Sequence, residues 1–179
     1  MDYQNCPTPI FGFSAFSGTG KTTLLTKLIP YLAKQGIRLA VIKHAHHNFD
    51  IDHPDKDSFK LRHAGAGQML ISSSQRWALM HELGPHEEQE YSLPQLLEKI
   101  DHRQADLILV EGFKKEPFTK IELHRPSLGH PLLCTKDDQI VAIAADAEVT
   151  VPARVTTLDL NQPQKIGAFI LQYYNLRPV

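Results

Sequence analysis

The chain has 179 residues, and its charged residues nearly balance, with a formal net charge of −1 at pH 7. This length favours one domain whose core needs no metal or disulfide to stabilise it. The near-neutral charge argues against a nucleic-acid binder that works by bulk electrostatics. Two cysteines are too few for a disulfide framework, and no apolar stretch is long enough to span a membrane. Residues 1–9 are expected to form a polar tail without a signal sequence, so we expect a cytoplasmic protein.

The first two predicted elements flank a glycine-rich turn. Residues 10–14 are apolar and predict a buried strand, and residues 21–35 predict a helix that Gly36 ends and that Pro30 kinks or breaks early. Residues 15–23 between them read Ala-Phe-Ser-Gly-Thr-Gly-Lys-Thr-Thr. A strand, a glycine turn, Gly-Lys-Thr and a helix form the pattern of a phosphate-binding P-loop.

The chemistry of phosphate binding explains this layout. Glycines let successive N–H groups point inward at phosphate oxygens, and the helix N-terminus adds partial positive charge. Lys21 is expected to act as a catalytic point charge on the outer phosphates, and the Thr22 hydroxyl to bind Mg²⁺. Ala15 stands where the full pattern has glycine, which would cost roughly 1 kcal/mol if the turn needs a positive φ there. The expected nucleotide-binding residues are Ser17, Gly18, Thr19, Gly20, Lys21, Thr22 and Thr23.

A second strand over residues 38–43 leads into a polar loop over 44–56. The end of the strand and the start of the loop read Lys43-His44-Ala45-His46-His47, and the loop continues with Asp50, Asp52 and His53. Three interpretations stay open. The loop could hold a transition metal, although its spacing matches no zinc pattern. It could be a solvated polar loop, or it could line the nucleotide with Lys43 or His44 on a phosphate.

The next predicted helix, over residues 58–66, follows Asp57. This carboxylate is either a helix N-cap or a group associated with Mg²⁺. Arg62 on the helix either reaches a phosphate or is exposed. After it, apolar runs predict strands at 69–73 and 76–80, and the spacing predicts an acidic loop over 84–91 and a helix over 93–100.

The second strong signal lies at residues 106–112. Residues 107–110 are continuously apolar, which predicts a strand buried on both faces, and Glu111 stands at its tip. P-loop proteins need an acidic residue at such a tip to orient Mg²⁺ or the attacking water. We expect Glu111 to be catalytic and metal-associated, and Gly112 to let the backbone approach phosphate. The alternative is an ordinary exposed glutamate.

Strands expected at 120–123, 140–145 and 155–160 and a helix at 163–173 complete the chain. Strands that alternate with helices imply an α/β protein with a mostly parallel sheet, of the P-loop NTPase three-layer type. The strands after residue 112 have no helices between them, so we expect them to add an antiparallel extension. Residues 10–179 are expected to form a single P-loop nucleotide-binding domain.

Two carboxylates compete for recognition of the base. Thr135-Lys136-Asp137-Asp138 fits a guanine-reading pattern, although a turn explains the same residues equally well. Asp146 follows a strand tip, where open α/β sheets bind ligands. The sequence leaves open whether Asp138 or Asp146 reads the base, and whether the base is guanine or adenine.

Together, the segments 15–23, 42–47, 57–58, 62–66 and 109–114 resemble the molybdopterin-guanine dinucleotide biosynthesis protein B family, MobB. The resemblance runs from about residue 10 to the end of the chain and implies a P-loop GTPase-like fold that binds GTP and Mg²⁺. It places Ser17 to Thr23 on the nucleotide and Glu111-Gly112 beside the γ-phosphate. It also implies weak GTPase activity, a homodimer, and a supporting role with the guanylyltransferase MobA in attaching GMP to molybdopterin. Asp55 departs from the family, which commonly has glycine there.

Two other functions stay open. A small-molecule kinase would use the same P-loop, but it usually needs an arginine-bearing lid, and the arginines form no cluster in the sequence. A metal-handling GTPase would need the polar residues 44–53 to bind a metal. Fast GTPases place a glutamine and an arginine at the γ-phosphate. Neither is evident beside Gly112, so slow hydrolysis is expected.

Overall fold

The computed structural model describes residues 3–45, 49–83 and 90–177. The chain divides into two compact units. The first comprises Met1–His44 and Leu93–Val179, and the second is Ala45–Ser92. No helix within the described ranges has the length and apolar character needed to cross a membrane.

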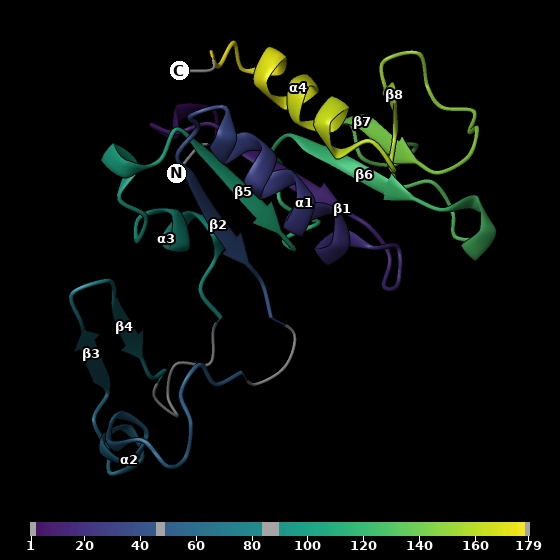
Figure 1. Ribbon diagram of the computed structural model, residues 1–179. Helices are drawn as coiled ribbons and strands as arrows, with labels where there is room; N and C mark the ends of the chain where they lie inside the picture. The colour runs from purple at the N-terminus through teal and green to yellow at the C-terminus, as the bar shows by residue number, and fades with distance from the viewer. Residues whose placement is uncertain (1–2, 46–48, 84–89, 178–179) are drawn as a thin grey trace. The chain divides into compact units, whose positions relative to one another are not determined.

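Six parallel strands make up the sheet of the first unit (Figure 1). Their order is β2-β5-β1-β6-β7-β8, so β1 lies between β5 and β6 near the centre. Every neighbouring pair is parallel, which brings the carboxyl ends of all six strands to one edge. The strands are β1 (Ile10–Ser14), β2 (Leu39–Lys43), β5 (Leu107–Glu111), β6 (Lys120–His124), β7 (Ile140–Ala145) and β8 (Thr156–Asp159).

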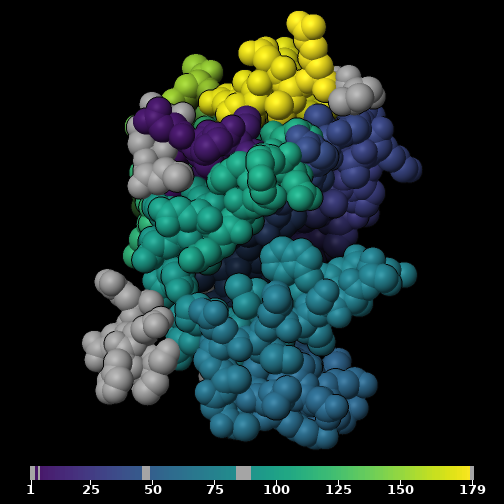
Figure 2. Space-filling view, turned by 90° about the vertical axis from the view of Figure 1, so that its left-hand side faces the viewer, coloured from purple at the N-terminus to yellow at the C-terminus, as the bar shows by residue number. Residues whose placement is uncertain are grey.

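Side chains of β5 alternate between the two faces of the sheet, as a strand buried on both sides requires. Leu107 and Leu109 join the core under α1 (Lys21–Lys34) and α4 (Pro163–Tyr173). Ile108 and Val110 join a second core with α3 (Leu93–Leu97) on the other face. Helices α1 and α4 lie side by side (Figures 1 and 2). The predicted three layers are confirmed.

Helix α1 runs through Pro30 to Lys34, so the expected early break is wrong. Pro30 is on the exposed face of the helix, where water can satisfy the carbonyl group that lacks its partner. The opposite face is held in the core by buried leucines, among them Leu28 and Leu32. Gly36 ends the helix as expected, with φ of 81° and its N–H donating to Ala33 O.

The α/β fold with a mostly parallel sheet is confirmed, but its antiparallel part lies elsewhere than expected. Strands β6, β7 and β8 pair in parallel. Residues 125–139 and 146–155 carry the chain back across the sheet without an α-helix, which a sufficiently long connection allows. The antiparallel pair is instead a separate hairpin in the second unit, formed by β3 (Gln68–Ser72) and β4 (Trp77–His81).

The second unit is organised around Arg62 of helix α2 (Asp57–His63). The side chain of Arg62 is 7% exposed. Its guanidinium donates to Glu82 at 2.5 Å and to Asp50 at 2.6 Å. Arg62 is therefore buried and paired with acidic side chains, so the expectation of an exposed arginine is wrong. It joins the loop before α2 to the segment after β4.

The described residues before β1 pack against the rest of the first unit. Residues Tyr3–Asn5 form a 3₁₀ helix, and the Tyr3 hydroxyl donates to Glu116. The hydroxyl of buried Thr8 donates to Ala105 O at 3.3 Å. The described start of the chain is thus attached to the segments that precede and follow β5.

Candidate functional site

The loop between β1 and α1 has the conformation that a P-loop needs. Gly18 and Gly20 adopt left-handed φ values of 79° and 101°, which glycine reaches without steric cost. The Thr19 hydroxyl donates to Phe16 O at 2.9 Å and closes the turn. Gly20 precedes the first helical residue, and no side chain caps the helix there. The N–H groups of the first turn therefore face the loop, where an anion can accept from them.

Ala15 fits this loop without the cost that a positive φ would carry. It is fully buried and does not belong to the described residues with a positive φ. The departure from the full glycine pattern is therefore compatible with the turn.

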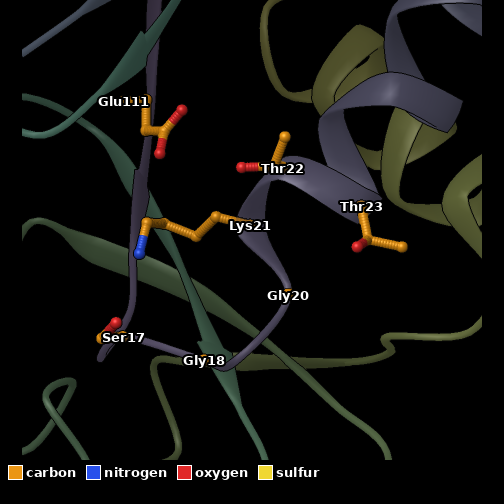
Figure 3. Close-up of a pocket in the computed structure, with 7 residues that line it drawn as sticks. All are labelled: Ser17, Gly18, Gly20, Lys21, Thr22, Thr23 and Glu111. Carbon is orange, nitrogen blue, oxygen red and sulfur yellow. The ribbon is translucent and has the colours of Figure 1, made fainter.

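An open pocket of about 360 Å³ lies in front of the loop. Its volume is at the lower end of the range of roughly 300–1,000 Å³ for ligand pockets. Figure 3 shows the Thr22 hydroxyl on the side that faces Glu111, whereas the Thr23 side chain points away from that residue. The pocket is lined by Ser17, Gly18, Gly20, Lys21, Thr22, Thr23 and Glu111.

Positive charges converge on this pocket. Burial lowers the pKa of Lys21 below its ordinary value, and the nearby charges of Lys114 and Lys43 lower it further, while Glu111 opposes the shift. The Lys21 ammonium lies 3.5 Å from Ala15 O. Lys114 also lies over the Phe16 ring, 5.6 Å from its centroid. A site that holds several cations at an electrostatic cost is matched to a polyanion, which removes that cost on binding.

Glu111 stands at the tip of β5, as predicted, with its side chain 15% exposed. It is opposite Lys43 in the pairing of β5 with β2, and the Lys43 ammonium lies 3.8 Å from its carboxylate. The backbone N–H of His44 donates to Glu111 O at 2.8 Å. The structure thus brings three of the predicted site residues together at one edge of the sheet.

Gly112 and Phe113 turn the chain sharply after β5. Their φ values are 103° and 51°, and a left-handed non-glycine residue costs about 1–2 kcal/mol. The Phe113 ring stacks on His44 at 4.8 Å, which contributes to holding this turn. A Cβ atom at position 112 would lie 2.6 Å from the His44 Cβ. Both the backbone and the packing therefore require glycine at this position.

Asp146 and Asp138 lie at opposite edges of the sheet. Asp146 follows the carboxyl end of β7, at the edge that carries the P-loop. Asp138 precedes the amino end of the same strand and pairs with Arg154 at 2.8 Å. Because a strand of this length spans about 20 Å, Asp138 is too far away to read the base of a nucleotide bound at the P-loop.

Asp57, predicted as a cap or a metal-associated carboxylate, is the first residue of α2 in the second unit. The capping position belongs to Lys56, and the Asp57 carboxylate pairs with Lys60 at 3.5 Å. His46 and His47 of the polar loop lie outside the described residues. Within the ranges that the structure describes, no three histidine, cysteine or acidic side chains group as a metal site would require.

Sequence reasoning missed two residues at this site, Arg125 and Lys114. Arg125 follows the carboxyl end of β6, and its Nε donates to Thr19 O at 3.0 Å. Its guanidinium also pairs with Asp146. Both missed residues follow strands whose carboxyl ends lie beside the P-loop, so the direction of β6 was the signal that would have identified Arg125.

Comparison with known proteins agrees with this geometry. The family model of molybdopterin guanine dinucleotide synthesis protein B, MobB, matches residues 10–146. The chain belongs to the MobB family. It is 46% identical to the molybdopterin-guanine dinucleotide biosynthesis adapter protein of Escherichia coli K12 over 166 residues, which cover 92% of this chain and 93% of that protein. It is 40% identical to the adapter protein of Haemophilus influenzae over 168 residues, covering 94% of this chain and 90% of that one.

A solved structure supports the MobB-family assignment. The crystal structure of molybdopterin-guanine biosynthesis protein B superposes with a TM-score of 0.71 and is 26% identical in sequence. The match covers 93% of this chain and 99% of the solved one. This MobB-family chain therefore shares its architecture with that protein over nearly its whole length.

The turn after β5 in this MobB-family protein gives a direct test of packing. We expect Gly112→Ala to lower the free energy of unfolding by about 2–4 kcal/mol, because alanine meets both the left-handed φ and the His44 side chain. Gly18→Ala is the matched control. Its φ is also positive but no atom lies within 4 Å of the added Cβ, so it should cost only about 1 kcal/mol. Urea unfolding measures both values, and equal losses would contradict the packing argument.

Proposed function

We propose that this chain binds GTP with Mg²⁺ at the P-loop and hydrolyses it slowly. The observation that carries the proposal is a pocket lined by the glycine loop, Lys21, the N-terminus of α1 and Glu111, with the charges of Lys43 and Lys114 close enough to act on Lys21. In that site the backbone N–H groups of residues 17–23 would hold the phosphates, and Gly112 would allow the chain after β5 to approach them. His44 and Lys43 would lie on the side of the outermost phosphate.

The residues present fit a magnesium ion. Mg²⁺ prefers oxygen ligands, and it binds through one or two protein groups while phosphates and water complete its coordination. The Thr22 hydroxyl and the Glu111 carboxylate are oxygen donors that line the same pocket. Bound there, Mg²⁺ would neutralise charge on the outer phosphates. Asp57 lies in the second unit, and its association with Mg²⁺ stays a prediction from the sequence.

The proposed biological role is that of an adapter in molybdopterin guanine dinucleotide biosynthesis in the cytoplasm. Its support is membership of the MobB family and high identity to two relatives that carry the adapter name. The proposed protein partner is the guanylyltransferase MobA, which transfers GMP to molybdopterin. The nucleotide state of the P-loop would then control how the adapter serves that partner.

Slow hydrolysis has a physical reason at this site. Fast P-loop GTPases neutralise the transition state with an arginine that reaches the γ-phosphate. Arg125 lies beside the loop, but its guanidinium is already bound to Thr19 O and to Asp146. Its contacts therefore direct it to the P-loop backbone rather than to the reacting phosphate.

Substitution of the P-loop lysine tests the nucleotide site. We expect Lys21→Ala to weaken binding of Mg·GTP by about 100-fold or more, because the variant loses a charge-assisted contact to phosphate. Calorimetry or fluorescent-nucleotide titration measures the affinity, and circular dichroism should report an unchanged fold. Lys27→Ala, an exposed lysine on the same helix, is the matched control and should bind like the wild type.

Wild-type affinity in Lys21→Ala would place the nucleotide elsewhere and contradict the proposal.

A second experiment separates an adapter from a kinase. With labelled Mg·GTP and candidate acceptors present, we expect slow release of free phosphate. Transfer of the γ-phosphate to an acceptor at a much higher rate would identify a kinase instead.

The lowered pKa of Lys21 predicts a proton linkage. In the nucleotide-free protein Lys21 loses its proton at lower pH than an ordinary lysine, and a bound polyphosphate restores the charge. Binding of GTP at alkaline pH should therefore take up protons, and affinity should fall as pH rises through this range. Calorimetry in two buffers of different ionisation enthalpy measures the uptake. Proton release on binding would contradict the assignment.

The proposed assembly is a homodimer formed through the hairpin of the second unit. Leu70 pairs across from Leu79, and these two side chains are 62% and 54% exposed. Trp77, on the same face, is 71% exposed. An isolated two-stranded hairpin is marginally stable in water, and exposed apolar surface of this kind is typical of an interface. A second copy of the chain would cover it.

Trp77 is the only tryptophan of the chain and can report this contact. We expect its fluorescence emission to shift to shorter wavelength as protein concentration rises, in step with a doubling of mass by light scattering. Leu79→Asp should abolish both changes, because it places a charge on the apolar face. Leu61→Asp, at an exposed position on α2, should leave them intact. Monomeric wild-type protein at high concentration would contradict the proposed dimer.

A further inference from the structure

We infer that Arg125 is a positioning residue of the P-loop, held in place by Asp146. Its guanidinium fixes the peptide between Thr19 and Gly20 in the orientation that a bound polyphosphate requires. This inference rests on the proposed nucleotide site and assigns a role there to a residue that the P-loop pattern does not contain.

The contacts of Arg125 all involve the loop or its support. Its Nε donates to Thr19 O at 3.0 Å, and its Nη1 pairs with the Asp146 carboxylate. Its Nη2 would lie 3.7 Å from a Cβ atom on Gly20. The guanidinium thus lies beside both Thr19 and Gly20, the two residues that precede Lys21.

The geometry of the peptide bond links this contact to phosphate binding. The described chain has no cis peptide bond. In a planar trans peptide, the C=O of one residue and the N–H of the next point in opposite directions. Because Arg125 holds Thr19 O on its own side, the N–H of Gly20 must point to the other side of that peptide. Gly20 lines the pocket, so its N–H is available to a phosphate oxygen.

Thr19 is fixed from a second direction as well. It is 2% exposed, and its hydroxyl donates to Phe16 O at 2.9 Å. Gly20 is free to adopt many backbone conformations, since it lacks a Cβ and has a φ of 101°. Without the contact from Arg125, the Thr19–Gly20 peptide could turn over at little steric cost, and its carbonyl oxygen would then face the phosphates.

The sheet explains why these two residues meet. His124 of β6 is opposite Ala145 of β7, and each is the last residue of its strand. Arg125 and Asp146 therefore leave the same edge side by side. Their side chains are 33% and 23% exposed, and ion pairs this accessible contribute about 0–1 kcal/mol to stability. The ion pair thus contributes little to folding stability. Its geometry does hold the Arg125 guanidinium in the position from which it donates to the loop.

Three roles for the pair make different predictions. If the pair positions the loop, substitution of either residue lowers affinity for GTP, GDP and ATP by similar factors, because every nucleotide uses the same loop amides. If Asp146 reads the base, its substitution would lower affinity for the guanine nucleotides GTP and GDP and leave affinity for ATP unchanged. If Arg125 stabilises the transition state, its substitution would lower the hydrolysis rate and leave nucleotide affinity unchanged.

The test uses Arg125→Ala and Asp146→Asn in the full chain. We expect each variant to bind Mg·GTP, Mg·GDP and Mg·ATP analogues about 10-fold more weakly than the wild type. Ethylguanidinium at millimolar concentration should restore much of the affinity of Arg125→Ala, because it can occupy the vacated position. The matched control is Arg38→Ala, which removes an exposed arginine paired with Asp106 before β5 and should bind like the wild type.

A spectroscopic readout needs no nucleotide. In ¹⁵N-labelled protein, the Gly20 amide resonance should move in Arg125→Ala and return with ethylguanidinium, while Arg38→Ala leaves it in place. Wild-type affinity with an unmoved Gly20 amide would overturn the inference. A loss confined to the guanine nucleotides GTP and GDP would also overturn it, and so would a slower hydrolysis rate at unchanged affinity. If the wild type itself binds no nucleotide, the proposed function fails, and the Gly20 resonance still decides whether Arg125 orients the peptide.

Discussion

The parallel direction of the six strands is the constraint on which the rest of the structure depends. It brings the carboxyl ends of β1, β2, β5, β6 and β7, with the residues that follow them, to one edge of the sheet. The P-loop, Lys43, Glu111, Arg125 and Asp146 come from five separate parts of the chain and meet there. Strands β1 and β5 carry buried apolar side chains on both faces, so the groups at their ends are held in place by the core.

The lysines and unpaired N–H groups at this edge of the sheet would be stabilised by a bound anion. Burial and neighbouring lysines disfavour the charged form of Lys21, and one acidic side chain, Glu111, offsets them in part. The first turn of α1 adds unpaired N–H groups to the same pocket. The fold therefore maintains at some cost a set of donors that a polyphosphate with its metal ion would satisfy. That arrangement is the physical content of the nucleotide-binding proposal.

Local chemistry could be predicted from the sequence, and tertiary placement could not. The P-loop, the buried strand before Glu111 and the glycine that ends α1 depend on residues adjacent in the chain, so the pattern contained them. Pro30 was misjudged because its effect depends on which face of α1 meets water. Asp138 matched a motif but lies at the wrong edge, since that depends on the direction of β7. Arg125 was missed because its partner, Thr19, is over a hundred positions away in the sequence.

The most direct test of the account is a map of amide chemical shifts on addition of Mg·GTP to the ¹⁵N-labelled chain. We expect the largest changes at the amides of residues 18–22, with smaller changes at Glu111 and Gly112. Residues beside Asp138, at the opposite edge of the sheet, should remain unchanged. The central claim would be contradicted by saturable binding whose largest shifts lie away from the bend between β1 and α1.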